Sequence, residues 1–189
     1  MKGRELDGAE PGATDITEQV AERFRWAVET MDPAPSDRLL EIGCGHGVAV
    51  SLICQGLSSG TIVAIDRSKA MIDRAVRRNR DHVDEGTAAF KAAALKDADF
   101  GNERFDKVFA INVRLFRAEA AREADVLQRL LIPKGVLYLF QQHPSANRTR
   151  AVTDELRSAL ERNGLTVRKL TSTGSGASTM TCIVAGPHG

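Results

Sequence analysis

Short apolar runs alternate with amphipathic stretches along the chain after residue 37. The runs are rich in Val, Ile, Leu and Phe and are bounded by glycines or polar residues, a pattern typical of buried strands. We predict strands in seven segments: 38–42, 61–65, 88–92, 105–111, 135–140, 165–170 and 179–186.

Helical spacing of apolar residues marks the segments between these strands and one segment before them. Asp15 with Glu18 is a helix-start signal, and the prolines of residues 32–37 end this first helix. Ser68 is placed to cap a later helix, and Gly164 to end the last one. The predicted helices span 15–32, 47–57, 68–83, 118–131 and 153–164.

Repeated strand–helix alternation indicates parallel strands covered on both faces and joined by right-handed crossovers. The last two strands have no helix between them, so we expect an antiparallel hairpin at the sheet edge. The predicted fold is α/β: a doubly wound, mostly parallel seven-stranded sheet (Rossmann-like) with an antiparallel C-terminal hairpin. We expect residues 1–14 to be flexible and 15–189 to form a single domain.

Three glycines crowd the end of the first strand, in LLEIGCGHG, directly after the carboxylate of Glu41. Glycines permit a tight turn and let a ligand approach the backbone closely, at the sheet edge where doubly wound folds bind ligands. Asp66 ends the next strand, where a carboxylate can accept the hydroxyls of a ribose. The pattern therefore predicts a nucleoside ligand.

The residues around these glycines narrow the choice of nucleoside. No Gly-Lys-Ser/Thr follows, as a P-loop requires, and Val48 stands where a dinucleotide fingerprint needs its third glycine. Glu41 would lie unfavourably beside a pyrophosphate but suits a ligand that carries an ammonium or a sulfonium.

At these residues the sequence resembles the class I S-adenosylmethionine-dependent methyltransferases. The matching segments are LLEIGCGHG, VAIDRSKAMIDRA, RFDKVFAINV and LQRLLIPKGVLYLF, and the resemblance runs from about residue 38 to 142. It implies S-adenosylmethionine as cofactor and 38–142 as the cofactor-binding core.

The resemblance also implies roles for individual residues. The glycine turn would wrap the methionine part, Glu41 would orient its amino group, Asp66 would bind the ribose, and the remaining residues would lie near the adenine. The implied cofactor residues are Glu41, Gly43, Cys44, Gly45, Gly47, Asp66, Arg67, Met71, Ala94 and Leu95.

One departure from the family pattern concerns the adenine. The segment after the third strand usually offers Gly-Asp-Ala, whereas Ala93, Ala94 and Leu95 stand here. An acidic partner for the adenine amino group is therefore missing, and Asp97 or Asp99 is the expected substitute.

The acceptor side is marked more weakly. His143 follows the fifth strand, where a neutral imidazole can take a proton from a hydroxyl or an amine, although a locally bonded loop histidine is an equally good interpretation. Asn112 and Arg114 follow the fourth strand, where members of the family place substrate-facing residues. No paired metal-ligand spacing is present, so no metal site is expected.

Composition and charge argue against nucleic acid and membranes as binding partners. The formal net charge is +1, which gives no general attraction to nucleic acid or to an anionic membrane. No apolar run approaches the roughly 20 residues of a membrane span. Three widely separated cysteines and an N-terminus without an apolar core favour the cytoplasm.

The leading hypothesis is an enzyme that transfers a methyl group from S-adenosylmethionine to an oxygen or nitrogen of a small molecule. The helix 15–32, with Phe24 and Trp26, is expected to cover the pocket, unless a second subunit of a homodimer does so. The alternatives are a non-methylating member of the fold, acting as a partner subunit or a cyclase, and a nicotinamide-dependent oxidoreductase.

Overall fold

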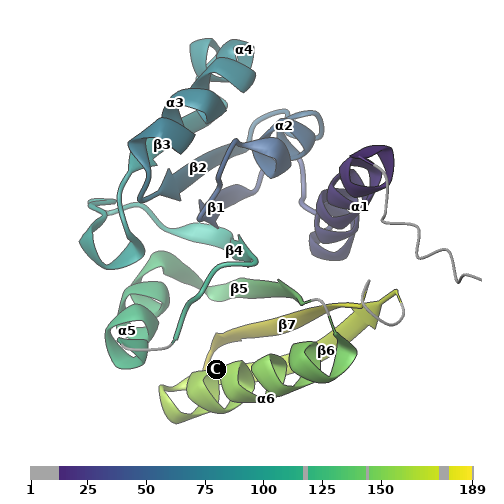
Figure 1. Ribbon diagram of the computed structural model, residues 1–189. Helices are drawn as coiled ribbons and strands as arrows, with labels where there is room; N and C mark the ends of the chain where they lie inside the picture. The colour runs from purple at the N-terminus through teal and green to yellow at the C-terminus, as the bar shows by residue number, and fades with distance from the viewer. Residues whose placement is uncertain (1–12, 117–118, 144, 175–178, 189) are drawn as a thin grey trace, which may run out of the picture.

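The computed structural model describes residues 13–116, 119–143, 145–174 and 179–188, and shows one sheet with helices on both faces (Figure 1). The strands are β1 (Arg38–Ile42), β2 (Thr61–Asp66), β3 (Ala88–Ala92), β4 (Phe105–Ile111), β5 (Leu131–Gln142), β6 (Leu165–Thr173) and β7 (Met180–Pro187). The helices are α1 (Ala13–Met31), α2 (Val48–Cys54), α3 (Lys69–Arg78), α4 (Arg80–Asp84), the short 3₁₀ helix η1 (Leu95–Asp97), α5 (Ala120–Leu130) and α6 (Ala146–Arg162).

The strand order confirms the predicted doubly wound sheet. It runs β3-β2-β1-β4-β5-β7-β6, with β1 to β5 parallel and β7 antiparallel to both of its neighbours. The C-terminal hairpin therefore forms as expected, with β6 at the edge and β7 inserted against β5. Because the order reverses beside β1, the carboxyl ends of β1 and β4 meet at the topological switch point, where such sheets bind ligands.

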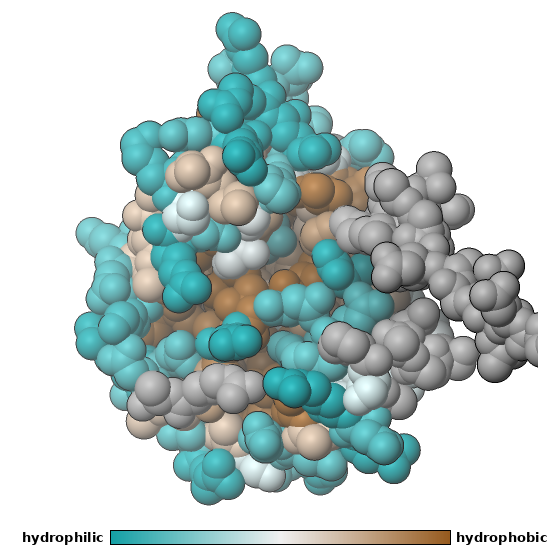
Figure 2. Space-filling model, viewed as in Figure 1, coloured by the Kyte–Doolittle hydropathy of each residue, from teal (hydrophilic) through white to brown (hydrophobic). Residues whose placement is uncertain are grey.

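Successive residues of a strand point to opposite faces, and this alternation divides the core into two clusters. Leu40 and Ile42 pack with α5 and α6 on one face, whereas Leu39 packs with α1, α2 and α3 on the other. In the view of Figure 2, hydrophobic residues show at the hollowed middle of the molecule and hydrophilic residues surround them.

Several predicted boundaries were wrong. The helix predicted at 118–131 ends at Leu130, and β5 begins at Leu131 rather than at residue 135, because Pro133 biases the residue before it toward extended backbone. The last helix begins at Ala146 rather than at residue 153, since the Ser145 side chain caps it by accepting a hydrogen bond from the Arg148 N–H at 3.3 Å. At the N-terminus, the helix predicted from residue 15 already includes Ala13.

The helix predicted at 68–83 is broken in two at Asn79, which is 1% exposed. Its amide nitrogen donates to the carbonyls of Gly47 and Ala75, at 3.1 and 2.9 Å, and its amide oxygen accepts from the Ser51 hydroxyl at 2.7 Å. These bonds replace continuation of the helix and fasten the end of α3 to the start of α2. The predicted Ser68 cap is confirmed, with the Met71 N–H donating to its hydroxyl.

We expect Asn79→Ala to lower the free energy of unfolding by about 2–3 kcal/mol, because it removes three hydrogen bonds and leaves buried polar groups without partners. Urea titration followed by circular dichroism measures this loss. Asn102→Ala, at an exposed position, is the matched control and should change stability by less than about 0.5 kcal/mol. Equal effects of the two substitutions would contradict the role given to Asn79.

Candidate functional site

The glycine turn after β1 adopts a backbone that L side chains rarely take. Gly43, Gly45 and Gly47 have φ values of 73°, 52° and 73°. The N–H groups of Gly43 and Cys44 both donate to the Ile65 carbonyl, at 2.7 and 3.0 Å, so the turn is tied to the end of β2. Glycine is therefore required by the conformation itself.

The space around each of these glycines differs. A Cβ at Gly43 would lie 2.4 Å from a methyl of Val113, and one at Gly47 would lie 2.6 Å from the Asn79 amide nitrogen. A Cβ at Gly45 would meet nothing within 4 Å. The turn is thus packed on both sides of Gly45 and open at Gly45 itself, which leaves the main chain there accessible to a ligand.

Asp66 joins the glycine turn to the start of α3. One carboxylate oxygen accepts from the Gly45 N–H at 3.0 Å, and the other accepts from the Ser68 N–H at 2.9 Å. An ionised carboxylate offers about four acceptor sites, so these two bonds leave capacity for the hydroxyls of a ligand. The residue predicted to bind the ribose thus also has a structural role. A bond at the start of the following helix is an alternative that the sequence itself offers for Asp66, whereas the bond to Gly45 was not predicted.

A cavity of about 550 Å³ opens at the carboxyl ends of β1 to β4, and we call it the first cavity. The sequence-predicted residues that line it are Gly43, Asp66, Arg67, Ala94, Leu95, Asn112 and Arg114. The other predicted cofactor residues do not line this cavity: Glu41, Cys44, Gly45 and Gly47 at the end of β1 and in the glycine turn, and Met71 in the first turn of α3.

Three charged residues of the first cavity were missed by sequence reasoning. Lys96 and Glu119 form an ion pair of 2.8 Å across its rim, and the Glu123 carboxylate accepts a hydrogen bond from the Phe116 N–H. Partial burial raises the pKa of Glu123. Glu119 and Glu123 stand at the start of α5. No local sequence motif predicts that the start of this helix lies at the cavity.

The two substitutes expected at the adenine edge do not reach the cavity. Asp97 lies 3.9 Å from the Arg122 guanidinium, and Asp99 accepts the Gly101 N–H at 2.8 Å. Neither lines the first cavity. The acidic groups on its wall are instead Asp66, Glu119 and Glu123.

Glu41 is a buried acid behind the glycine turn, only 1% exposed. Its Oε2 atom has no hydrogen-bond partner among the described residues. Burial, and secondly the nearby negative charge of Asp66, raise the pKa of Glu41 to about 8. The carboxyl group is therefore mostly neutral at pH 7, and a cationic ligand group nearby would favour its ionised form.

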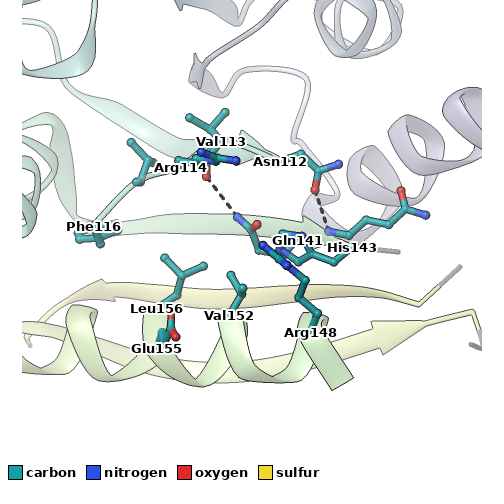
Figure 3. A pocket seen from close by; sticks show the side chains of 12 residues that line it. Asn112, Val113, Arg114, Phe116, Gln141, His143, Arg148, Val152, Glu155 and Leu156 are labelled. Carbon is teal, nitrogen blue, oxygen red and sulfur yellow. Dashed lines mark hydrogen bonds between the residues drawn. The ribbon is translucent and has the colours of Figure 1, made fainter. Parts of the chain in front are cut away.

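A second cavity, of about 280 Å³, adjoins the first (Figure 3). It lies between the segment after β4, the end of β5 and one side of α6. Asn112, Arg114 and His143, predicted for the acceptor side, all line it. The segment Asn112–Leu115 lines both cavities and so forms the wall between them.

This shared wall is anchored to β5. Asn112 has a left-handed φ of 56°, its side-chain oxygen accepts from the Gln142 N–H at 2.7 Å, and its own N–H donates to the Phe140 carbonyl at 2.9 Å. The Gln141 side chain donates to the Val113 carbonyl at 3.4 Å. Asparagine tolerates this backbone region better than most residues, which explains its presence at the end of β4.

The N-terminal helix packs beside these cavities without lining either one in the part of the chain whose side chains are described. The Trp26 ring meets the Phe140 ring edge-on, with centroids 5.4 Å apart, and the Arg23 guanidinium donates to the Gln142 side-chain oxygen at 3.4 Å. That this helix covers the pocket remains a prediction.

Metal and membrane signals are absent from the described part of the chain. No group of three or more His, Cys, Asp or Glu residues there is arranged to hold a metal ion. Among the described helices, none has both the length and the apolar character needed to cross a membrane.

Comparison with known families identifies the class of protein. Residues 39–135 match the family described as "Methyltransferase domain", and the chain belongs to this family. The match includes the glycine turn, Asp66 and the wall between the cavities, and it ends where β5 begins to cross the sheet.

Two curated relatives extend the similarity beyond that range. An uncharacterized 37.1 kDa protein in a Streptomyces fradiae transposon is 25% identical over 90% of this chain and 53% of its own length. The O-methyltransferase cnsE of Penicillium expansum is 26% identical over 71% of this chain and 50% of its own length. The chain spans about half the length of the curated relatives it matches.

Two solved structures share the fold over nearly the whole chain. Magnesium protoporphyrin IX methyltransferase of Synechocystis PCC 6803, with bound S-adenosylmethionine, has a TM-score of 0.70 and 18% identity, covering 97% of this chain and 87% of its own. The [4+2]-cyclase SpnF has a TM-score of 0.74 and 15% identity, covering 98% and 86%. A cyclase among these neighbours shows that the fold alone does not determine the reaction.

S-adenosylmethionine is the cofactor that this family implies, and the first cavity, taken together with the glycine turn beside it and the acid behind that turn, fits it. The main chain at Gly45 is open, Asp66 retains acceptor capacity, and Glu41 supplies a buried acid with a partnerless oxygen among the described residues. The open main chain at Gly45 allows a close contact with the ligand, and Asp66 can accept the hydroxyls of its sugar. Glu41 can favour a cationic group of the ligand nearby.

Glu41→Gln should stabilise the protein above about pH 8 and have little effect near pH 5. Glu41 in the folded protein keeps its proton between its ordinary pKa of 4.5 and about 8, whereas the unfolded chain loses it, so the stability of the unaltered protein falls as the pH rises through this window. The difference should reach the order of 4 kcal/mol at alkaline pH.

Melting temperatures of both proteins across this pH range test the expectation. Glu29→Gln, which removes an exposed carboxylate, should leave the pH profile unchanged. A constant difference between Glu41→Gln and the unaltered protein at every pH would show that Glu41 is not buried as a neutral acid.

Proposed function

We propose that this protein transfers a methyl group from S-adenosylmethionine to an oxygen or nitrogen of a small-molecule acceptor. The single observation that carries the proposal is the pair of adjoining cavities at the switch point of the sheet, which share the wall Asn112–Leu115. Transfer between two bound molecules requires two sites in contact, with the reacting atoms held in line.

The first cavity is the proposed cofactor site. The open main chain around Gly45 receives the methionine part, Asp66 accepts the ribose hydroxyls, and Glu41 acts behind the turn on the cationic end. Cys44 and Gly47 shape the turn from behind. The residues proposed to contact the adenine are Arg67, Met71, Ala94 and Leu95. Of these, Arg67, Ala94 and Leu95 line the cavity.

The cofactor supplies a methyl group already activated by a sulfonium, so the protein's main tasks are alignment and exclusion of water. Lone-pair attack on the methyl carbon breaks the carbon–sulfur bond, whose electrons remain on sulfur. Asn112 and Arg114 are the proposed acceptor-binding residues on the shared wall. His143, which also lines the second cavity, is the proposed base for the proton of the nucleophile.

The size of the second cavity supports a small acceptor. Its volume of about 280 Å³ lies at the lower end of the range for small-molecule sites. A net charge of +1 gives no support to a nucleic-acid substrate. We propose a cytoplasmic protein without a membrane partner, and closure of the pocket by the N-terminal helix or by a second copy of the chain.

Asp66→Asn should weaken S-adenosylhomocysteine binding by about tenfold or more, because an amide offers one oxygen where the carboxylate offers two. Isothermal titration calorimetry measures the affinity. Asp125→Asn, an exposed position on α5, is the control and should bind as the unaltered protein does. A thermal melt of each variant separates loss of the ligand contact from loss of the hydrogen bonds to Gly45 and Ser68.

The same titration with NAD tests the oxidoreductase alternative, since tighter binding of NAD than of S-adenosylhomocysteine would overturn the proposal. Cofactor binding with no methylated product from a broad panel of hydroxyl and amine compounds would favour the non-methylating alternative. Product formation is followed by mass spectrometry.

His143→Gln should lower kcat by about 10²-fold or more, with little change in S-adenosylhomocysteine affinity, if the imidazole takes the acceptor's proton. The acid limb of the pH–rate profile, which reports a base that must be deprotonated, should disappear in the variant. An unchanged acid limb would remove His143 from the reaction and leave it as a loop residue bonded locally.

A further inference from the structure

The second cavity is lined by two arginines as well as by apolar side chains. Arg114 reaches it from the segment after β4, and Arg148 reaches it from the first turns of α6. In Figure 3, Arg148 extends from α6 toward Gln141 and His143, while Arg114 lies beside Val113 on the opposite wall. The two arginines thus approach one space from separate elements of the fold.

Neither guanidinium has an ion pair or a side-chain hydrogen bond to any described residue. The hydrogen bond recorded for Arg148 comes from its backbone N–H, which donates to the Ser145 hydroxyl. Outside the second cavity, Arg157 pairs with Glu161 at 3.1 Å and Lys96 with Glu119 at 2.8 Å, so neither acidic residue is engaged by the two arginines. Both arginines of the second cavity therefore keep their donors available to a ligand.

The only acidic side chain among the described residues that line this cavity is Glu155. Arg114, Arg148 and Glu155 together carry one net positive charge. A single carboxylate balances this charge, whereas a phosphate dianion exceeds it. The planar fork of a guanidinium also matches the two oxygens of a carboxylate.

Part of the remaining lining is apolar. Phe116, Val152 and Leu156 form this apolar part, the last two from the side of α6 that faces the cavity. The rest of the lining consists of Val113 and Leu115 of the shared wall and of the polar residues Asn112, Gln141, Gln142 and His143. An acceptor that filled the cavity would therefore place a compact apolar body against the apolar part and its charged group near the arginines.

We propose that the methyl acceptor is a small carboxylic acid with an apolar body, whose carboxylate is bound by Arg114 and Arg148. This inference rests on the proposed function, because it identifies the substrate class of the same site. The hydroxyl or amine that takes the methyl group is a separate group on that molecule, directed toward the shared wall.

The test compares carboxylates with their neutral amides on the 189-residue chain saturated with S-adenosylhomocysteine. The probes are para-hydroxybenzoate and para-aminobenzoate, their meta isomers, and the corresponding benzamides, titrated by calorimetry. At least one carboxylate should bind about tenfold or more tightly than its amide, since the amide cannot form a charge-assisted pair with either arginine.

Arg114→Gln and Arg148→Gln should each reduce that preference by about tenfold, with thermal melts unchanged. Arg150→Gln is the matched control, since Arg150 is exposed on the same helix and does not line the cavity. Its carboxylate preference should equal that of the unaltered protein.

The outcomes separate this inference from the proposed function. Failure of S-adenosylhomocysteine to bind overturns both. If it binds and no carboxylate in the panel is preferred over its amide, the carboxylic-acid inference alone is overturned. A preference that survives both Arg114→Gln and Arg148→Gln, or falls equally in Arg150→Gln, also overturns it.

Discussion

The hydrogen bond from the Gly45 N–H to the Asp66 carboxylate is the interaction on which the site depends. It joins the turn after β1 to the end of β2, and the second Asp66 oxygen extends the link to the first residues of α3 through Ser68. Two parallel strands and two helix starts are thereby held in one arrangement at the switch point. The positive φ angles of the turn require glycine, and the carboxylate holds those glycines so that a ligand meets a shaped surface without ordering it first.

Most of the fold could be predicted because its signals are local. Each strand is a short apolar run, and the alternation of strands with helices fixes a parallel sheet through the handedness of crossovers. The errors at the start of β5 and at the start of the last helix came from local signals that were not used, at Pro133 and Ser145. The error within the helix predicted at 68–83 arose where a tertiary contact overrides a local pattern. Asn79 is acceptable within a helix by spacing alone, yet its side chain bonds to Gly47 and Ser51, which are distant in sequence, and the helix breaks there.

The residues of the candidate site likewise fall into those that local signals could predict and those that depend on tertiary packing. Gly43 and Asp66 were predictable because they follow consecutive strands whose ends must meet, and both line the first cavity. Arg148 and Glu123 were not, because each stands on a helix whose return to the sheet edge depends on packing rather than on a motif. The part of the site fixed by strand topology was thus accessible from sequence, and the part supplied by α5 and α6 was not.

The wall between the two cavities is thin and firmly attached. A methyl of Val113 occupies the space where a Cβ of residue 43 would lie, and the Val113 carbonyl accepts the Gln141 side chain on the other side. Val113 therefore contacts both cavities. A ligand that displaced Val113 in one cavity would change the shape of the other. If a ligand in one cavity changes the affinity of the other through Val113, thermodynamic reciprocity requires an equal factor in the opposite direction.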